Sequence, residues 1–293
     1  MADQKRCERR FLAEIEPGHR HFSPLRAALA LSQAAEPGRL PSQVLLPLLQ
    51  GLPALDERLA GMGKPYQKFE ALSSYFFGEL GFLAAGPAEN GLAVTELHAV
   101  VTRRRGRALS LALLYYDLAR RLAFPLRALA QPGGVLLGSH WLPRGHVLDP
   151  ADGAVLPLDA ARHRVELLIS GRRLAFQPQR LNPLSSRQLL ERYLVAMRIV
   201  YQAEGLAEEA LRAADWRVRL MPRSRAARWD RGLLLYSQDR YEDADRDLGG
   251  LLGRTGRPRD DTPERPASTA KEARENRAAV NHLLASLSGE VDA

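Results

Sequence analysis

The stretch that decides the fold is "RRRGRALSLALLYYDLARRLAFP", residues 103–125, a polar turn followed by a run that is apolar on nearly every side. A helix of this kind is expected to be buried at the centre of a domain. Several enzyme families place a nucleophile on the first turn of such a helix, where the helix dipole favours an anion. Here residues 106–110 read "GRALS", without a cysteine. The turn is therefore either part of a catalytic site or part of a related site that has lost its nucleophile.

The sequence on either side of this helix predicts an α+β fold. Upstream, helices alternate with Pro and Gly breaks: residues 23–34 begin with Ser23 as a plausible N-cap and Pro24 at the first helical position, and residues 65–82 show helical spacing. After Pro125, short apolar runs between Gly and Pro predict an antiparallel sheet. These runs are "LRALAQ", "GVLLG", "HVLDP" and "AVLPL", and "ARHRVELLIS" and "RRLAFQPQ" close the region.

An internal repeat follows this region. Residues 205–222 align with residues 239–256 at an offset of 34, which places Ala210 over Ala244. Thirty-four residues is the tetratricopeptide period, and a small residue lets two helices pack closely. Two copies are fewer than the three that an independent solenoid usually needs. The repeat is therefore either a helical appendage packed on the main domain or a groove that docks a partner.

Five segments are expected along the chain. They are an N-terminal extension over residues 1–21, a main domain over 22–182, two repeats over 185–253, a polar Pro-rich linker over 254–268, and a C-terminal helix and tail over 269–293.

Composition predicts a cytoplasmic globular protein. Hydrophobic residues make up 45% and charged residues 26%, which is ordinary for a globular chain. The apolar run 108–116 is too short to span a bilayer, and the N-terminal residues lack the apolar core of a secretion signal, so no membrane association is expected. The single cysteine, Cys7, excludes an internal disulfide. It lies in a terminus that is expected to be mobile, and we interpret it as incidental.

The positive charge lies in the middle of the chain. Residues 100–182 hold 13 Lys or Arg against 5 Asp or Glu, which accounts for the whole net charge of +8. A basic field attracts acidic partners or nucleic acid. However, aromatic residues do not interleave with the arginines as a base-stacking surface requires. Weak nucleic-acid association therefore stays a distant alternative.

Four short matches give the chain a family resemblance. They are Arg104-Arg105-Gly106 in the turn, residues 122–125 at the helix exit, Pro132-Gly133 before a strand, and Asp149-Pro150 after the next strand. With this spacing, residues 20 to 253 resemble the bacterial SirB-type family. The resemblance implies a transglutaminase-like (papain-like) domain with N-terminal helices, a central buried helix and a small antiparallel sheet. A helical tetratricopeptide-type extension follows that domain in the family.

The departures from the family pattern bear on chemistry. The position of the nucleophilic cysteine falls at Ala108 and that of the general-base histidine at Gly134, so only the orienting acid, Asp149, is present. The resemblance therefore implies a degenerate triad, because a carboxylate alone cannot supply nucleophile and base. A groove beside Ala108, Gly134, Trp141 and Asp149 could still hold a peptide or small molecule.

Other residues offer substitutes for the missing groups. Ser110, about 200° around the helix from Ala108, could act with His140 and Asp149, although a small polar residue at a packing seam is the simpler interpretation. His140, His146 and Asp149 have metal-ligand side chains, but His146 and Asp149 would point to opposite faces of one strand. We interpret Asp149 as structural and expect neither a metal nor a cofactor. The remaining histidines lack ligand spacing: His19, His21, His98, His163 and His282.

The sequence thus favours a non-catalytic, transglutaminase-like, cytoplasmic protein that acts as a protein-binding or regulatory module. Its protein partner is expected to bind through residues 185–253. The alternative is a hydrolase or acyltransferase with a rearranged Ser110 and His140 site.

Overall fold

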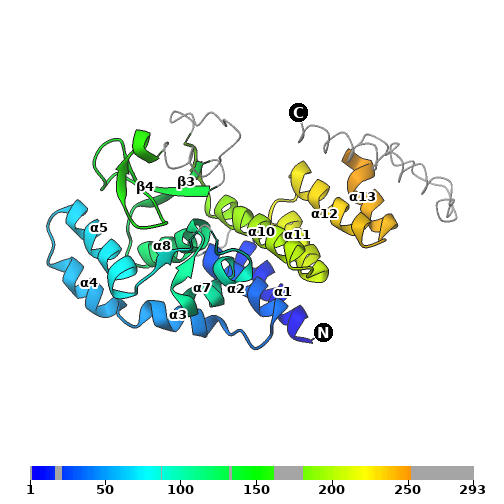
Figure 1. Ribbon diagram of the computed structural model, residues 1–293, viewed down its shortest axis with the longest axis horizontal. Coiled ribbons are helices and arrows are strands. Elements are labelled where there is room, and N and C mark those ends of the chain that lie inside the picture. The colour runs from blue at the N-terminus through cyan, green and yellow to red at the C-terminus, as the bar shows by residue number, and fades with distance from the viewer. Residues whose placement is uncertain (1, 17–21, 87, 132–133, 162–180, 252–293) are drawn as a thin grey trace. The chain divides into compact units, whose positions relative to one another are not determined.

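The computed structural model describes residues 2–16, 22–86, 88–131, 134–161 and 181–251 (Figure 1). The chain forms two compact units, Met1–Ala227 and Arg228–Ala293. The first two helices of the predicted repeats, over residues 186–203 and 207–220, therefore belong to the same unit as the helices and sheet before them. The expected linker over 254–268, the C-terminal helix, the "RRLAFQPQ" run and most of "ARHRVELLIS" lie outside the described residues.

The first unit begins with helices and ends in a helical hairpin. Its helices are α1 (Ala2–Ile15), α2 (Pro24–Ala35), α3 (Pro41–Leu49), α4 (Leu52–Ala60), α5 (Pro65–Ser73), the π-helix η1 (Ser74–Glu79), α6 (Leu92–Thr95), α7 (Leu97–Arg103), α8 (Ala108–Arg121), α10 (Ser186–Ala203) and α11 (Ala207–Leu220). The strands are β1 (Leu83–Ala84), β2 (Arg105–Gly106), β3 (Leu126–Gln131), β4 (Gly134–Ser139), β5 (His146–Leu148), β6 (Val155–Pro157) and β7 (Pro183–Leu184).

Helix α8 is the buried helix that the sequence predicts. Ten of its residues, Ser110 to Ala119, are buried, and it packs against β3, β4, α2 and α10 (Figure 1). Its one buried acid, Asp117, accepts hydrogen bonds from the Ser23 hydroxyl at 2.9 Å and from Arg121 Nε at 2.6 Å. The buried carboxylate is therefore satisfied, as a low-dielectric interior requires. Its bond to Ser23 ties the start of α2 to the central helix.

The sheet covers α8 and is antiparallel throughout. The strand order is β6-β5-β4-β3-β7, and β3 pairs with β4 from Leu126↔Ser139 to Gln131↔Gly134. The four strand predictions are confirmed, because each of the four short apolar runs contains one strand. A separate two-stranded parallel bridge joins β1 to β2 immediately before α8.

The helical spacing over 65–82 is confirmed as far as Glu79: α5 ends at Ser73 and continues directly into the π-helix η1. One prediction is wrong. The N-terminal segment is not mobile: α1 carries Cys7 and Phe11 on its buried face, and Phe11 stacks on Trp216 with ring centroids 4.3 Å apart. Cys7 is 2% exposed, because it shares an apolar stripe with Phe11 one turn later.

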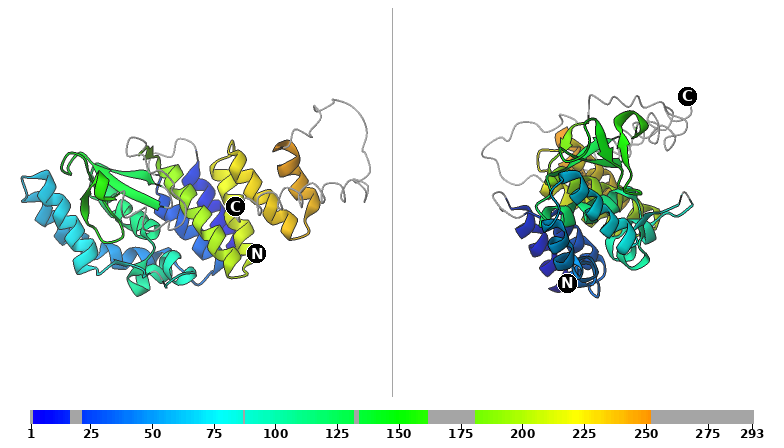
Figure 2. Two further views of the ribbon diagram at one scale, coloured as in Figure 1. Left: turned by 45° about the horizontal axis from the view of Figure 1, so that its top comes forward. Right: turned by 90° about the vertical axis from the view of Figure 1, so that its left-hand side faces the viewer.

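The repeat is visible in backbone hydrogen bonds. Leu206 N–H donates to the Tyr201 carbonyl at 2.8 Å, and 34 residues later Arg240 N–H donates to the Leu235 carbonyl at 2.9 Å. Each bond closes the turn of a helical hairpin, α10–α11 in the first case and α12 (Arg225–Ser237) with α13 (Tyr241–Leu251) in the second. Both turns also contain a residue with positive φ at the same repeat position, Gly205 and Asp239. In Figure 2 the first hairpin lies beside α1 and α2.

Candidate functional site

The turn before α8 is held by neighbouring backbone. The Arg107 N–H donates to the Val94 carbonyl at 2.6 Å, and Arg107 is the extended N-cap residue of the helix. Gly106 lies so close to Val100 that an added Cβ would come within 2.7 Å of it. Ala108 is the first helical residue and is half-buried. The backbone thus presents the side chain of residue 108 at a helix N-terminus, but that side chain is a methyl group.

Gly134 opens strand β4 opposite the end of β3. Arg192 of α10 donates from Nη1 to the carbonyls of Gly134 at 3.1 Å and Gln131 at 3.3 Å. Burial lowers the pKa of Arg192 from its ordinary value, but an arginine remains charged at physiological pH. A cation from α10 therefore fixes the end of the hairpin where the family pattern places an imidazole. Pro132-Gly133, the preceding residues of that pattern, lie outside the described part of the chain.

Asp149 ends β5 and shapes the turn that follows. Its Oδ1 accepts a hydrogen bond from the Ala151 N–H at 2.9 Å, and its carbonyl accepts one from the Gly153 N–H at 2.8 Å. The Ala151 carbonyl in turn accepts from the Ala84 N–H of β1, the partner of β2 just before α8. This arrangement agrees with a structural interpretation of Asp149 and joins its turn to the start of the central helix.

The structure does not bring Ser110 to a base. Ser110 is fully buried, and its hydroxyl donates to the Thr95 carbonyl at 2.7 Å. His140 is exposed and lies edge-on to Trp141, with ring centroids 6.3 Å apart. His146 Nδ1 lies 3.1 Å from the Arg144 carbonyl. Among the described hydrogen bonds, none links Ser110 to an imidazole, and the described residues include no cluster of three His, Cys, Asp or Glu side chains suited to a metal.

A family model for the transglutaminase-like superfamily matches residues 43–195, which span α3 to α10 and include all three positions described above. The chain belongs to the transglutaminase-like superfamily. Curated relatives are each called UPF0162 protein: one from Xylella fastidiosa (strain 9a5c) is 33% identical over 63% of this chain and 67% of its own length. One from Pseudomonas aeruginosa is 36% identical over 42% of this chain and 44% of its own, and one from Vibrio cholerae is 25% identical over 72% and 78%.

Among solved structures, the crystal structure of menin that reveals the binding site for Mixed Lineage Leukemia (MLL) protein is 13% identical. It covers 87% of this chain and 71% of its own, with a TM-score of 0.37. At that score the likeness carries no argument about fold or function. The match to a second Xylella fastidiosa relative (strain Temecula1) covers 60% of that protein, so the curated relatives extend beyond the matched region.

The transglutaminase-like domain holds a buried carboxylate that the sequence analysis did not single out. Glu96 is 1% exposed and caps α7, accepting the Ala99 N–H at Oε2 (3.0 Å). Arg39 reaches the same oxygen at 2.8 Å, and His98 Nδ1 lies 3.2 Å from Oε1. His98 Nε2 lies 3.0 Å from the Leu40 carbonyl. The cluster thus ties the start of α7 to the loop between α2 and α3.

Burial alone would raise the pKa of Glu96, but the hydrogen bonds it receives, led by the one from His98, lower it to about 2. The carboxylate is therefore charged throughout the physiological range. Arg39 is 57 positions away from Glu96 in the chain, and no local sequence pattern marks the pair. The "TELH" stretch at residues 95–98 offers only a carboxylate at a possible N-cap.

Several arginines of the basic middle region contact other residues of the fold. Arg105 and Arg121 pair with Glu89 and Asp117, at 3.3 and 2.6 Å. Arg120 donates to the Phe22 carbonyl and lies over the Tyr116 ring, and Arg104 lies over the Phe82 ring. These contacts give four of the described arginines structural partners within the fold.

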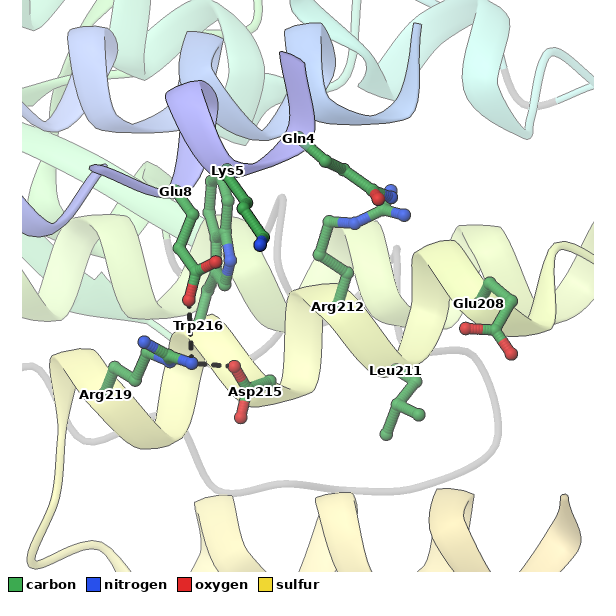
Figure 3. A pocket seen from close by; sticks show the side chains of 9 residues that line it. All are labelled: Gln4, Lys5, Glu8, Glu208, Leu211, Arg212, Asp215, Trp216 and Arg219. Carbon is green, nitrogen blue, oxygen red and sulfur yellow. Dashed lines mark hydrogen bonds and ion pairs between the residues drawn. The ribbon is translucent and has the colours of Figure 1, made fainter. Parts of the chain in front are cut away.

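Three cavities of the described part border α1, and none of them is lined by Ala108, Gly134 or Asp149. The one between α1 and α11 measures about 360 Å³ and is lined largely by charged side chains (Figure 3). Arg219, which lines the cavity, pairs with Glu8 and with Asp215 at 2.8 Å each. Ion pairs thus already occupy one side of this cavity. No helix of the described residues is long and apolar enough to cross a membrane.

Proposed function

We propose that this chain is a non-catalytic member of the transglutaminase-like superfamily that works in the cytoplasm as a protein-binding, regulatory module. The observation that carries the proposal is that Ala108 starts α8 and Gly134, whose carbonyl binds Arg192, starts β4, so that neither position bears a reactive side chain. The backbone at the start of α8 and at the start of β4 is well ordered by hydrogen bonds. However, the side chain is a methyl group at Ala108 and a hydrogen atom at Gly134. Neither can attack a carbonyl or take a proton.

The second part of the proposal is that the hairpins α10–α11 and α12–α13 are tetratricopeptide-type repeats that bind a protein partner. Support comes from the 34-residue offset between equivalent hydrogen bonds and from Ala210 and Ala244, which are 0% and 2% exposed at equivalent positions. Small buried residues there permit close helix packing. Helical repeats of this kind use their surfaces for protein recognition.

The catalytic part is tested with activated-serine and thiol probes and a panel of amide and ester substrates, applied to wild type and to Ser110→Ala. We expect no turnover by either protein and no labelling of Ser110 in wild type. The variant should nevertheless lose about 1–3 kcal/mol of stability, because the Thr95 carbonyl loses its buried donor. Wild-type turnover that Ser110→Ala abolishes would contradict the proposal and support the rearranged Ser110 and His140 site.

The binding part is tested by affinity capture from the source cells with the full chain and with a chain that ends at Arg223. The shortened chain retains α10 and α11, which pack within the first unit. We expect a partner that the full chain retains and the shortened chain loses. The circular dichroism of the shortened chain should still show the helices of the first unit. Equal capture by both would remove α12 and α13 from the proposed binding surface.

A further inference from the structure

A cavity of about 550 Å³ lies over α1, α2 and the beginning of α3, and we call it the α1–α3 groove. Its apolar lining comes from Ala13 of α1, Ala30 of α2, and Leu40 and Leu45 at the start of α3. The volume falls within the roughly 300–1,000 Å³ of ordinary ligand sites. None of the residues that line it belongs to the degenerate triad or to residues 185–253.

The charged side chains that line the groove, which we call its rim, are mostly basic. They are Arg6, Arg10 and Arg26 against one carboxylate, Glu14. Glu14 lies 3.5 Å from Arg26, so a single ion pair accounts for the only acidic side chain in the lining. Arg10 donates to the neutral amide oxygen of Gln33 at 2.8 Å, and no ion pair is described for Arg6. The rim therefore has two positive charges that the lining does not neutralise.

The apolar lining is presented by a fixed backbone. Leu40 is 49% exposed, although a leucine at a helix start is more stable when covered. Its N–H donates to Gln43 Oε1 at 2.9 Å, and its carbonyl lies 3.0 Å from His98 Nε2. The neighbouring Arg39 is anchored on the buried Glu96. The backbone of Leu40 is thus held on both sides, and its side chain remains exposed in the groove.

We infer that the α1–α3 groove binds an acidic amphipathic peptide segment, whose apolar side chains cover Leu40 and Leu45 and whose carboxylates pair with Arg6 and Arg10. Arginine forms strong, directional hydrogen bonds with carboxylates, and an apolar floor with a charged rim suits one face of an amphipathic helix. No aromatic ring lines the groove, so base stacking cannot favour a nucleic acid there. This site is additional to the repeat surface proposed above and does not depend on it.

The test is fluorescence anisotropy with the full-length protein and a labelled helical peptide of about four turns, with leucines at helical spacing on one face and glutamates elsewhere. A second probe carries lysines in place of the glutamates, and a third carries serines in place of the leucines. We expect the acidic amphipathic probe to bind most tightly, with an affinity that falls as salt is raised. Arg6→Glu and Leu40→Ser should each weaken this binding by about tenfold.

Two matched variants control for charge and for exposed apolar area. Arg144→Glu changes an exposed arginine outside the groove, and Leu46→Ser changes a leucine that is 58% exposed on α3 but does not line it. Both should bind the probe as wild type does, and all four variants should melt cooperatively. The inference fails if wild type does not bind the acidic probe, if the lysine probe binds equally well, if the groove variants match the controls, or if anionic lipid vesicles bind and the peptide does not. Failure here leaves the capture experiment with the shortened chain unaffected.

Discussion

Glu96→Ala is expected to lower the free energy of unfolding by about 3–5 kcal/mol, because it leaves the Arg39 guanidinium and His98 beside an empty, buried position. The Ala99 N–H at the start of α7 loses its acceptor as well. The matched control is Glu36→Ala. Glu36 pairs with the same arginine at 2.7 Å, but its side chain is 60% exposed. An exposed pair contributes at most about 1 kcal/mol.

The Glu96 carboxylate also predicts that the free energy of unfolding falls at acid pH. Its pKa is about 2 in the folded chain against 4.5 for the free group. Because the folded pKa is the lower one, the stabilisation is complete above pH 4.5 and is lost as the pH falls toward 2. The full difference amounts to about 3 kcal/mol. Urea unfolding of wild type and Glu96→Gln across this range measures it: the two curves should converge on acidification, and parallel curves would contradict the assignment.

Gly153→Ala is the second substitution expected to have a large effect. Gly153 has φ +73° in the turn after Asp149, and an added Cβ would lie 2.3 Å from the Phe77 ring. Phe77 is half-buried and stacks on Tyr115 of α8 with ring centroids 5.8 Å apart, so the ring can give way only by changing this contact. The left-handed backbone costs about 1–2 kcal/mol, and overpacking adds about 1–3 kcal/mol.

Gly145→Ala separates these two costs. Gly145 has φ +74°, but no atom lies within 4 Å of an added Cβ. Thermal unfolding of the two variants should therefore show the backbone cost in both and the steric cost only in Gly153→Ala. Equal destabilisation would mean that Phe77 yields freely and that the turn after Asp149 is not packed against the aromatic cluster below it.

Local patterns predict the elements whose signals lie within one turn or one strand. Ser23 caps α2 as expected, accepting the Arg26 N–H at 3.2 Å, with Pro24 at the first helical position. The run "LRALAQ" is β3 from its first residue to its last. The buried central helix follows in the same way, because a helix apolar on all sides has no stable place on a surface. These features depend on short-range chemistry that the sequence displays directly.

Features that depend on distant partners were not predictable from the sequence. Glu96 meets Arg39, and Gly134 meets Arg192, only because the fold brings α7 to the α2–α3 loop and the β3–β4 hairpin to α10. The burial of Cys7 likewise depends on α1 packing against a surface formed by other helices. For the candidate site, sequence spacing locates Ala108, Gly134 and Asp149 on their elements, but it does not reveal that Ser110 bonds to Thr95.

The central claim is that residue 108 occupies a nucleophile position in a fold that supplies no nucleophile. Its most direct test is the pH dependence of iodoacetamide labelling, followed by mass spectrometry, for the double variant Ala108→Cys, Gly134→His. An added Cβ at residue 134 would lie 2.8 Å from the amide nitrogen of Gln131, so the flexible end of that side chain must move to admit it. The control is Leu109→Cys, Gly134→His, whose thiol points about 100° away around α8.

We predict that wild type, whose Cys7 is buried, is labelled slowly, and that the thiol of Ala108→Cys reacts with a midpoint clearly below the free-thiol value of about 8.5. The thiol of the control variant should titrate near that value. If the thiol introduced by Ala108→Cys titrates at or above about 8.5, or reacts no faster than the control, that result would contradict the claim that this helix start is a nucleophile position.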